Sequence, residues 1–360
     1  MKTMFTTMIA AYICGNIYIF IRAWQTFSGC SLSWKLTISV IYWIAVFSLI
    51  ISMFFRHVEI PEFLSQGLFT LGSIWLVFTL YMVLALLVMD MARMIVPFLK
   101  PLSFYVALGF TCCLLIYGYF NYKYPDINHL DITLEKPIKG SPMKIIAISD
   151  VHLGNGTRKP QLKKYVETIN AQQPDLIVIC GDLIDNSLLP LYQQKMEEEL
   201  NKLKAPMGIY LVPGNHEYIS GIEECERFLK NTPIRLLRDT IVTLPNGLQL
   251  IGRDDRANRR RVPIVNLMKK VDPTKPTLLL DHQPYELAKK DSLGIDIQFS
   301  GHTHRGQVWP MSLLVDNMYE QSHGYRKWSH SHVYVSSGLS LWGPPFRIGT
   351  DSEMTVMTIR

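Results

Sequence analysis

Five short polar clusters between residues 150 and 304 carry side chains that could do chemistry. They are Asp-Val-His at 150–152, Gly-Asp-Leu-Ile-Asp at 181–185, Gly-Asn-His-Glu at 214–217, one histidine at 282, and Gly-His-Thr-His at 301–304. Carboxylate, imidazole and amide groups together supply the oxygen and nitrogen ligands that suit divalent cations of hard to borderline character. The pattern therefore predicts a metal centre whose ligands are distant in sequence.

Each cluster directly follows a short apolar run of the kind that forms a buried strand. The runs are 145–148, 176–180, 209–212, 278–280 and 297–299. In open α/β sheets, ligands bind beyond the carboxyl ends of the strands. We therefore expect five strands to deliver these clusters to one rim.

Strand-like and helix-like segments alternate after residue 143, which predicts an α/β fold with a parallel or mixed sheet. A further strand-like run covers 248–251, and helical periodicity covers 161–171, 191–204, 221–230 and 263–270. Residues 127–134 alternate like a first edge strand. The runs 333–335 and 354–359 are predicted to return to the sheet.

Four stretches near the N-terminus contain no charged residue: 3–21, 36–55, 63–89 and 101–122. Crossing a hydrocarbon core of ~30 Å takes about 20 helical residues. Tyr and Trp residues near their ends are typical of membrane interfaces. The sequence thus predicts a four-helix transmembrane region and a multi-pass protein of the cell membrane. The flanking lysines and arginines leave the side of the following domain open.

These features divide the chain into three predicted parts. Residues 1–122 form a transmembrane anchor, 123–142 a linker with the first edge strand, and 143–360 the domain that carries the clusters. No ionisable residue lies in the middle of a span, which argues against a transporter. The cysteines show no spacing typical of a disulfide framework.

Part of the net charge of +6 comes from one loop with five arginines between 253 and 261. This loop is either simply solvated or in contact with anionic headgroups or a phosphorylated substrate. No aromatic residues interleave with the arginines, so no nucleic-acid partner is expected. A serine nucleophile elbow and a phosphate-binding P-loop are both missing from the sequence.

The five clusters, in this order, resemble the calcineurin-like metallophosphoesterase superfamily. Ser-Asp-Val-His-Leu-Gly at 149–154, Leu-Asp-His-Gln-Pro at 280–284 and the segment 337–347 are similar to its bacterial membrane-associated phosphodiesterase branch, typified by YkuE and YaeI. The resemblance covers roughly residues 144–360. It implies a four-layer α-β-β-α sandwich.

The resemblance also implies two divalent metal ions (Mn, Fe or Zn) and a role for each matching residue. One metal would be held by Asp150, His152 and His304, and the other by Asn215, His282 and His302, with Asp182 bridging both. A hydroxide between the metals would attack phosphorus. His216 would act as general acid and Asp185 would accept its hydrogen bond, while Glu217 and Asp281 are either supporting or local. Arg305 and Arg347 are candidate contacts for substrate phosphate.

The function implied is hydrolysis of a phosphodiester or pyrophosphate bond in a phosphorylated small molecule or lipid. Relatives in the superfamily split nucleotide-sugar lipid pyrophosphates in envelope synthesis, which makes a lipid substrate an alternative. A non-catalytic scaffold is a second alternative, although such members lose ligands that are all present here. A protein phosphatase would carry Arg-Gly after Asp185, where this chain has Asn186 and Ser187.

Overall fold

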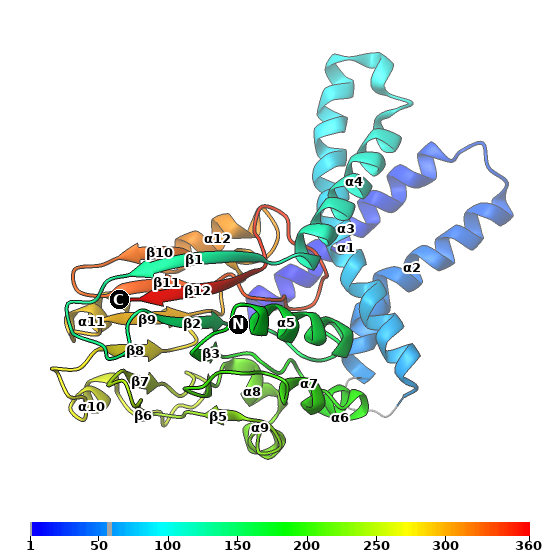
Figure 1. Ribbon diagram of the computed structural model, residues 1–360. Helices are drawn as coiled ribbons and strands as arrows, with labels where there is room; N and C mark the ends of the chain where they lie inside the picture. The colour runs from blue at the N-terminus through cyan, green and yellow to red at the C-terminus, as the bar shows by residue number, and fades with distance from the viewer. Residues whose placement is uncertain (1, 56–59) are drawn as a thin grey trace. The chain divides into compact units, whose positions relative to one another are not determined.

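The computed structural model describes residues 2–55 and 60–360 and separates the chain into two compact units (Figure 1). The helical unit comprises residues 1–120 with 343–346. The α/β unit comprises residues 121–342 with 347–360. Each unit has a hydrophobic core of its own.

The helical unit contains four long helices within the described residues. They are α1 (Lys2–Thr26), α2 (Leu32–Phe55), α3 (Glu62–Ile95) and α4 (Ser103–Lys123), with the short η1 (Pro97–Leu99) before α4. All four are long and apolar enough to cross a membrane. This agrees with the predicted number of spans.

Helix α3 continues six residues past the end of its predicted apolar stretch, through Asp90 and Arg93 to Ile95. The Asp90 carboxylate lies 3.0 Å from the Arg22 guanidinium and 3.2 Å from that of Arg93. Charges at a helix end are tolerated near apolar surroundings when they are paired in this way. Their pairing explains why the helix does not stop where the charges begin.

The α/β unit is built on two six-stranded sheets. The first has the order β1-β12-β2-β3-β4-β5, with β1 (Asp126–Ile132), β12 (Glu353–Ile359), β2 (Met143–Ile148), β3 (Leu176–Cys180), β4 (Ile209–Val212) and β5 (Ile234–Leu236). The second has the order β10-β11-β9-β8-β7-β6, with β10 (Gly324–Lys327), β11 (His332–Val335), β9 (Ile297–Ser300), β8 (Thr277–Leu280), β7 (Gln249–Gly252) and β6 (Thr240–Thr243).

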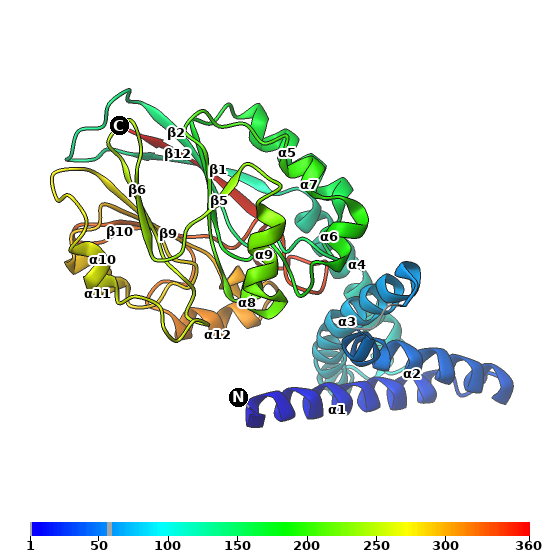
Figure 2. The ribbon, with the colours of Figure 1, turned by 90° about the horizontal axis from the view of Figure 1, so that it is seen from below.

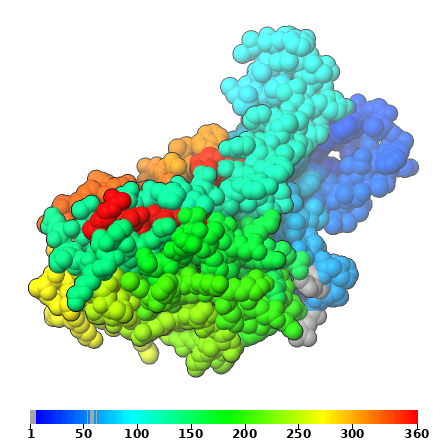
Figure 3. All heavy atoms as spheres, in the orientation of Figure 1, coloured from blue at the N-terminus to red at the C-terminus, as the bar shows by residue number. Residues whose placement is uncertain are grey.

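Both sheets are mixed, with parallel strands at their centres. Strands β2 to β5 are parallel to one another, as are β7, β8, β9 and β11. Strand β12 pairs antiparallel with β2 and parallel with β1, which lies at the edge as predicted. In the space-filling view the red atoms of β12 lie beside the teal β1 segment (Figure 3).

Side chains along the central strands point alternately to the two faces of the sheet, and they pack into two separate hydrophobic cores. On β2, Ile145 and Ala147 face the second sheet and pack with Leu280 and Phe299. Residues 146 and 148 of the same strand belong instead to the core beneath the helices α5 (Lys159–Ala171), α7 (Glu197–Leu200) and α9 (Ile222–Leu229). Successive side chains of a strand point to opposite faces, which is why one strand serves both cores.

Helices cover the outer faces of both sheets and complete four layers (Figure 2). Figure 2 shows α5 and α9 outside the first sheet, and α10 (Ile264–Met268) and α11 (Leu287–Ser292) outside the second. Strands β7 and β8 pack against α10 through Ile251, Leu279 and Leu267. The predicted α-β-β-α sandwich is therefore confirmed.

Several elements differ from the sequence prediction. The single helix expected over 191–204 is two short helices, α6 (Leu189–Gln194) and α7, because Lys195 adopts a left-handed conformation between them. Strands β5, β6 and β10 and the helices α8 (Asn215–Ser220) and α12 (Met311–Met318) were not predicted. Each spans three to eight residues, which is too few for a reliable periodicity.

Candidate metal centre

The five polar clusters lie together as expected, and the strands that lead into them belong to two sheets. Strands β2, β3 and β4 of the first sheet lead into the loops with Asp150, Asp182 and Asn215. Strands β8 and β9 of the second sheet lead into those with His282 and His302. The site therefore lies where the carboxyl ends of strands from two facing sheets meet.

Three overlapping groups of side chains could each hold a metal ion. Within each group the candidate ligand atoms all lie within 4.8 Å of one another. The groups are Asp150, His152 and His304; His152, Asp182 and His216; and Asp182, His282 and His302. All of the predicted His and Asp ligands therefore converge.

The first group brings two imidazoles onto one carboxylate. The Nε2 atoms of His152 and His304 lie 3.1 Å apart, and that of His304 lies 3.4 Å from Asp150 Oδ1. The Asp150 carboxylate also accepts the backbone N–H of His302 at 3.0 Å. Ring nitrogens and a carboxylate that converge on one point form the donor set that imidazole-binding divalent metals require.

In the third group, the ring of His282 has a fixed orientation. His282 Nδ1 lies 2.7 Å from the Cys180 carbonyl oxygen, so this nitrogen carries the proton and donates it. The other ring nitrogen, Nε2, then faces Asp182 Oδ2, 3.1 Å away. A histidine ligand typically donates its other ring N–H to an oxygen in this way.

Asn215 supplies an unsatisfied acceptor. It is the first residue of α8, immediately before His216, and its side-chain Oδ1 is buried without a hydrogen-bond partner among the described residues. A buried polar atom without a partner is costly, and a bound cation would satisfy it. This observation fits the amide ligand that the sequence predicted.

Asp182 is common to two of the three groups. Its Oδ2 lies 3.1 Å from His282 and 3.9 Å from His152, whereas its Oδ1 accepts the His216 backbone N–H at 2.9 Å. Only a carboxylate can offer two oxygens and a shared negative charge to neighbouring cations. The position suits the bridging role that the resemblance implied.

Asp185 contacts two histidines, not one. Its Oδ1 lies 3.2 Å from His216 Nδ1 and 3.3 Å from His152 Nδ1. Burial raises the pKa of Asp185, but the two histidines outweigh burial and lower it to about 2. Burial lowers the pKa of His216, yet Asp185 and Asp182 raise it to about 9. Asp185 is thus an anion that orients both rings, and His216 carries a proton at neutral pH.

Glu217 joins two of the loops, a role that the sequence left open. Its buried carboxylate accepts the backbone N–H groups of Asp182 at 2.9 Å, Ile184 at 3.0 Å and Gly214 at 2.7 Å. Carboxylates that accept several backbone donors are among the strongest hydrogen-bonding anchors in proteins. Glu217 therefore fixes the loop after β3 against the loop after β4.

Asp281 lies within a buried basic cluster behind His282. Its carboxylate contacts the Lys290 ammonium at 2.6 Å and the guanidinium of Arg261 at 3.4 Å. Burial raises the pKa of Asp281, but Lys290 and Arg261 lower it below its usual range. Arg253 is also buried and pairs with Asp239 at 3.2 Å.

The arginine loop is therefore only partly solvated. Arg253 and Arg261 are internal, and Arg256 lies over the Tyr285 ring at 4.2 Å. Arg259 and Arg260 are exposed and remain the loop's candidates for anion contact.

Arg347 is not the substrate contact that the sequence suggested. It is fully buried and donates to the carbonyl oxygens of His304 at 2.8 Å, Ser337 at 2.5 Å and Ser340 at 2.5 Å. The guanidinium thus ties the loop after β9 to the loop after β11. Arg305 is half-buried, so it remains a candidate for substrate contact.

The site backbone is strained at the predicted ligands. Asp150, His152, Asp182, His302 and His304 all have left-handed conformations, with φ between 46° and 72°. Each such residue costs about 1–3 kcal/mol and persists only where the surrounding structure enforces it. At Gly214, a Cβ would overlap the Asp182 carboxylate. The fold therefore holds these side chains in place before any ligand arrives.

An aromatic and apolar rim adjoins the cluster, and sequence reasoning missed it. The ring of Trp342 lies 6.4 Å from that of His216, and the ring of Tyr319 lies 6.4 Å from that of His302. Tyr319 follows α12, on which Leu313, Leu314 and Met318 are all exposed. Isolated apolar residues in short loops and helices show no periodicity that could have marked them.

Two facing mixed sheets with a His, Asp and Asn cluster at their carboxyl ends define a metallophosphoesterase. Residues 143–306 match the family model described as Calcineurin-like phosphoesterase. An uncharacterized metallophosphoesterase of Helicobacter pylori is 36% identical over 272 residues, which cover 72% of each chain. The chain belongs to the calcineurin-like metallophosphoesterase family and is a metal-dependent phosphoric ester hydrolase.

Two further relatives extend the comparison. The uncharacterized metallophosphoesterase YkuE of Bacillus subtilis is 29% identical over 68% of this chain and 90% of its own length. A transmembrane protein with metallophosphoesterase domain from Danio rerio is 30% identical over 71% of this chain and 62% of its own length. Apolar helices and a relative with this name indicate a membrane protein.

Proposed function

We propose that the chain is a membrane-anchored phosphoesterase with two metal ions that hydrolyses phosphodiester or pyrophosphate bonds. The observation that carries this proposal is the set of three overlapping His and Asp groups, with Asp182 common to two of them and Asp185 in contact with His216. Helices α1 to α4 would hold the protein in the cell membrane as a multi-pass anchor.

In this proposal Asp150, His152 and His304 hold one cation, Asn215, His282 and His302 hold the other, and Asp182 contacts both. Cations bound there supply a nucleophile by lowering the pKa of water and offset negative charge on the phosphoryl oxygens. Mn²⁺, Fe and Zn²⁺ all suit this mixture of nitrogen and oxygen ligands.

His216 would give its Nε2 proton to the oxygen that leaves phosphorus. Its pKa of about 9 keeps that proton available at neutral pH. Asp185, 3.2 Å from Nδ1, holds the ring so that Nε2 faces the site and stabilises the charged form. The leaving group then departs as an alcohol or as a protonated phosphate rather than as an alkoxide or a fully ionised phosphate.

Removal of metal provides the direct test. Full-length protein purified in neutral detergent and stripped with a chelator is expected to lose hydrolysis of bis-p-nitrophenyl phosphate. Adding back Mn²⁺, Fe²⁺ or Zn²⁺ singly should restore it, and elemental analysis should find two metal equivalents per chain. A diester, a monoester and a pyrophosphate are assayed side by side. Undiminished activity in protein shown to be free of metal would contradict the proposal.

A lipid substrate is the second candidate, and the apolar rim favours it. Leu313, Leu314 and Met318 are 54%, 60% and 65% exposed, far more than apolar residues with a packing role. Exposed apolar surface beside a catalytic site commonly marks where an apolar part of a ligand binds. Acyl chains of a lipid pyrophosphate could lie along α12 while its phosphates reach the metal cluster.

Substitutions on α12 separate lipid from water-soluble substrates. The double variant Leu313→Gln with Leu314→Gln is expected to lower turnover of a lipid pyrophosphate about a hundredfold or more, since each leucine side chain that the lipid buries contributes roughly 1.5–3 kcal/mol. Turnover of a water-soluble diester should stay unchanged. Val265→Gln, an exposed apolar position on α10, is the matched control. Equal losses for both substrates would argue against the lipid.

A further inference from the structure

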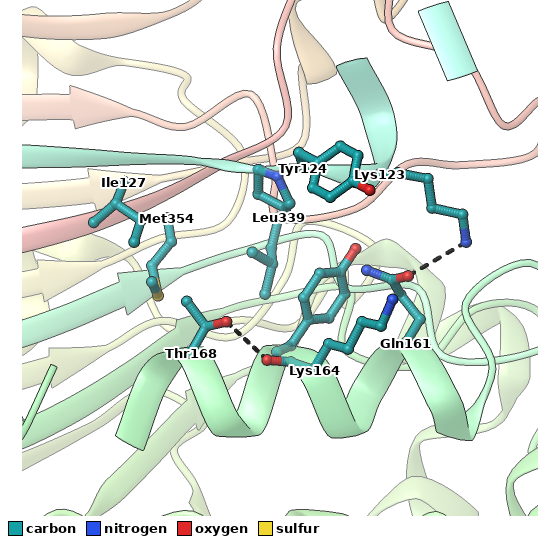
Figure 4. Close-up of a pocket in the computed structure, with 10 residues that line it drawn as sticks. Lys123, Tyr124, Ile127, Gln161, Lys164, Thr168, Leu339 and Met354 are labelled. Carbon is teal, nitrogen blue, oxygen red and sulfur yellow. Dashed lines mark hydrogen bonds between the residues drawn. The ribbon is translucent and has the colours of Figure 1, made fainter. Parts of the chain in front are cut away.

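A pocket separate from the metal cluster lies where α4 ends and β1 begins (Figure 4). Its volume is about 210 Å³, more than ten times the roughly 15 Å³ that one water requires. Lys123, Gln161, Lys164 and Tyr165 contribute its polar lining, and Leu339 and Met354 lie on its apolar side. None of the candidate metal ligands lines it. The pocket can therefore admit a polyatomic ligand independent of the metal centre.

The charge of the pocket is one-sided. It contains the ammonium groups of Lys123 and Lys164, and no acidic residue is among the described residues that line it. Lys123 Nζ donates to Gln161 Oε1 at 3.3 Å. Lys164 forms no ion pair with any residue in the ranges 2–55 and 60–360. A pocket lined by two lysines and, among the described residues, by no acidic residue favours an anion that can bridge the two ammonium groups.

The deeper wall adds buried polar groups. Gln161 and Tyr165 are 7% and 4% exposed. The Tyr165 hydroxyl makes no hydrogen bond within the described part of the chain, although Gln161 and Ser340 lie near enough to interact with it electrostatically. A buried hydroxyl without a bond costs free energy that an incoming acceptor would recover. The wall therefore suits a ligand with acceptor oxygens, such as a phosphate.

Chain continuity places this pocket at a bilayer surface. Lys123 is the last residue of the apolar span Ser103–Lys123, and Tyr124 follows it. Lysine and tyrosine at the end of a span lie at the level of lipid headgroups. This step depends on the membrane crossing proposed above. Phosphate groups are the abundant anions at that level, and glycerol and acyl carbons lie directly beneath them.

We propose that this pocket binds the phosphate of an anionic membrane phospholipid. Lys123 and Lys164 contact the phosphate oxygens, the Tyr165 hydroxyl donates to one of them, and the apolar side formed by Leu339 and Met354 packs against the glycerol and first acyl carbons. The pocket would therefore bind a lipid headgroup, whereas the metal centre would bind the bond that is hydrolysed.

The pocket is also connected to the metal-binding loop. The backbone N–H of Leu339 donates to the Ser149 carbonyl at 2.9 Å, and that of Ser340 donates to the Asp150 carbonyl at 3.1 Å. The segment that lines the pocket therefore supports the loop that carries Asp150. A bound lipid would stiffen this segment.

Native mass spectrometry of the full-length protein in neutral detergent tests the proposal. Phosphatidylglycerol is titrated against phosphatidylcholine, with inorganic phosphate as a separate arm. Each lysine near a membrane surface contributes roughly fivefold to anion binding, so Lys123→Gln with Lys164→Gln should weaken phosphatidylglycerol binding about thirtyfold. Lys163→Gln, on the same helix but paired with Glu167 at 3.9 Å and not lining the pocket, should leave it unchanged.

A third variant and an activity assay test the lipid site further. Tyr165→Phe, which removes only the hydroxyl, should weaken binding severalfold without altering the thermal unfolding of lipid-free protein. Equal binding of phosphatidylglycerol by wild type and the double lysine variant would overturn the proposal. So would a pocket that holds inorganic phosphate but shows no preference for the lipid. Hydrolysis of a soluble diester is measured in parallel; its absence in wild type would count against the proposed function alone.

Discussion

Asp182→Ala is expected to abolish metal-dependent hydrolysis, with a loss of about a thousandfold or more, because metal stabilisation of phosphoryl charge is worth several kcal/mol. The carboxylate lies 3.1 Å from His282 Nε2 and 3.9 Å from His152 Nε2, so its removal opens both proposed metal sites at once. It also removes the acceptor of the His216 backbone N–H. Asp182 also belongs to two of the three groups of candidate ligands.

Metal content distinguishes this effect from general unfolding. The purified variant should retain its helical and strand signal by circular dichroism but hold fewer than two metal equivalents by elemental analysis. Asp131→Ala removes a carboxylate that is exposed on β1 and forms an ion pair with Arg360 at 3.4 Å, and it should keep full activity and metal. An Asp182→Ala protein with two bound metals and wild-type turnover would remove the basis of the proposal.

The local sequence was sufficient to identify the polar clusters and the strands before them. Each of the runs that lead to Asp150, Asp182 and His282 is apolar throughout, as buried central strands are, and the polar residues begin where each strand ends. Such a boundary between a strand and its loop is a property of neighbouring residues. The boundary can therefore be recognised in the sequence without knowledge of the tertiary structure.

The distribution of these strands over two sheets was not predictable in the same way. Ile145 on β2 and Phe299 on β9 are equally apolar, and nothing in either run specifies the sheet that it joins. Pairing is decided by contacts between residues far apart in sequence. The assignment of each strand to one of the two sheets therefore required the structure.

The role of Arg347 depends on tertiary contacts in the same manner. Its guanidinium is satisfied almost entirely by backbone carbonyl groups, which every residue possesses and no sequence pattern marks. The second contact of Asp185, to His152 Nδ1 at 3.3 Å, likewise arises only when the loops after β2 and β3 meet. Positions that depend on long-range backbone geometry are thus the ones that sequence reasoning misses.

His216→Asn is expected to lower turnover about a hundredfold to ten-thousandfold, the range typical of a lost general acid, while both metals remain bound. The reason is that the ring carries a proton held by Asp185 at 3.2 Å and that another residue of the site, Asn215, supplies the neighbouring ligand atom. His129→Asn is the matched control, because His129 is exposed on β1.

The leaving group of the substrate separates a general acid from a metal ligand. A nitrophenolate leaves without a proton, so His216→Asn should slow a nitrophenyl diester much less than an alkyl diester of the same shape. Asp185→Asn should also slow the alkyl diester more than the nitrophenyl diester, but with a smaller loss of turnover. The reason is that this substitution weakens His216 as a proton donor without removing it. If His216→Asn instead lost metal and slowed both diesters equally, His216 would belong to the metal ligands, as its place in the group with His152 and Asp182 would then require.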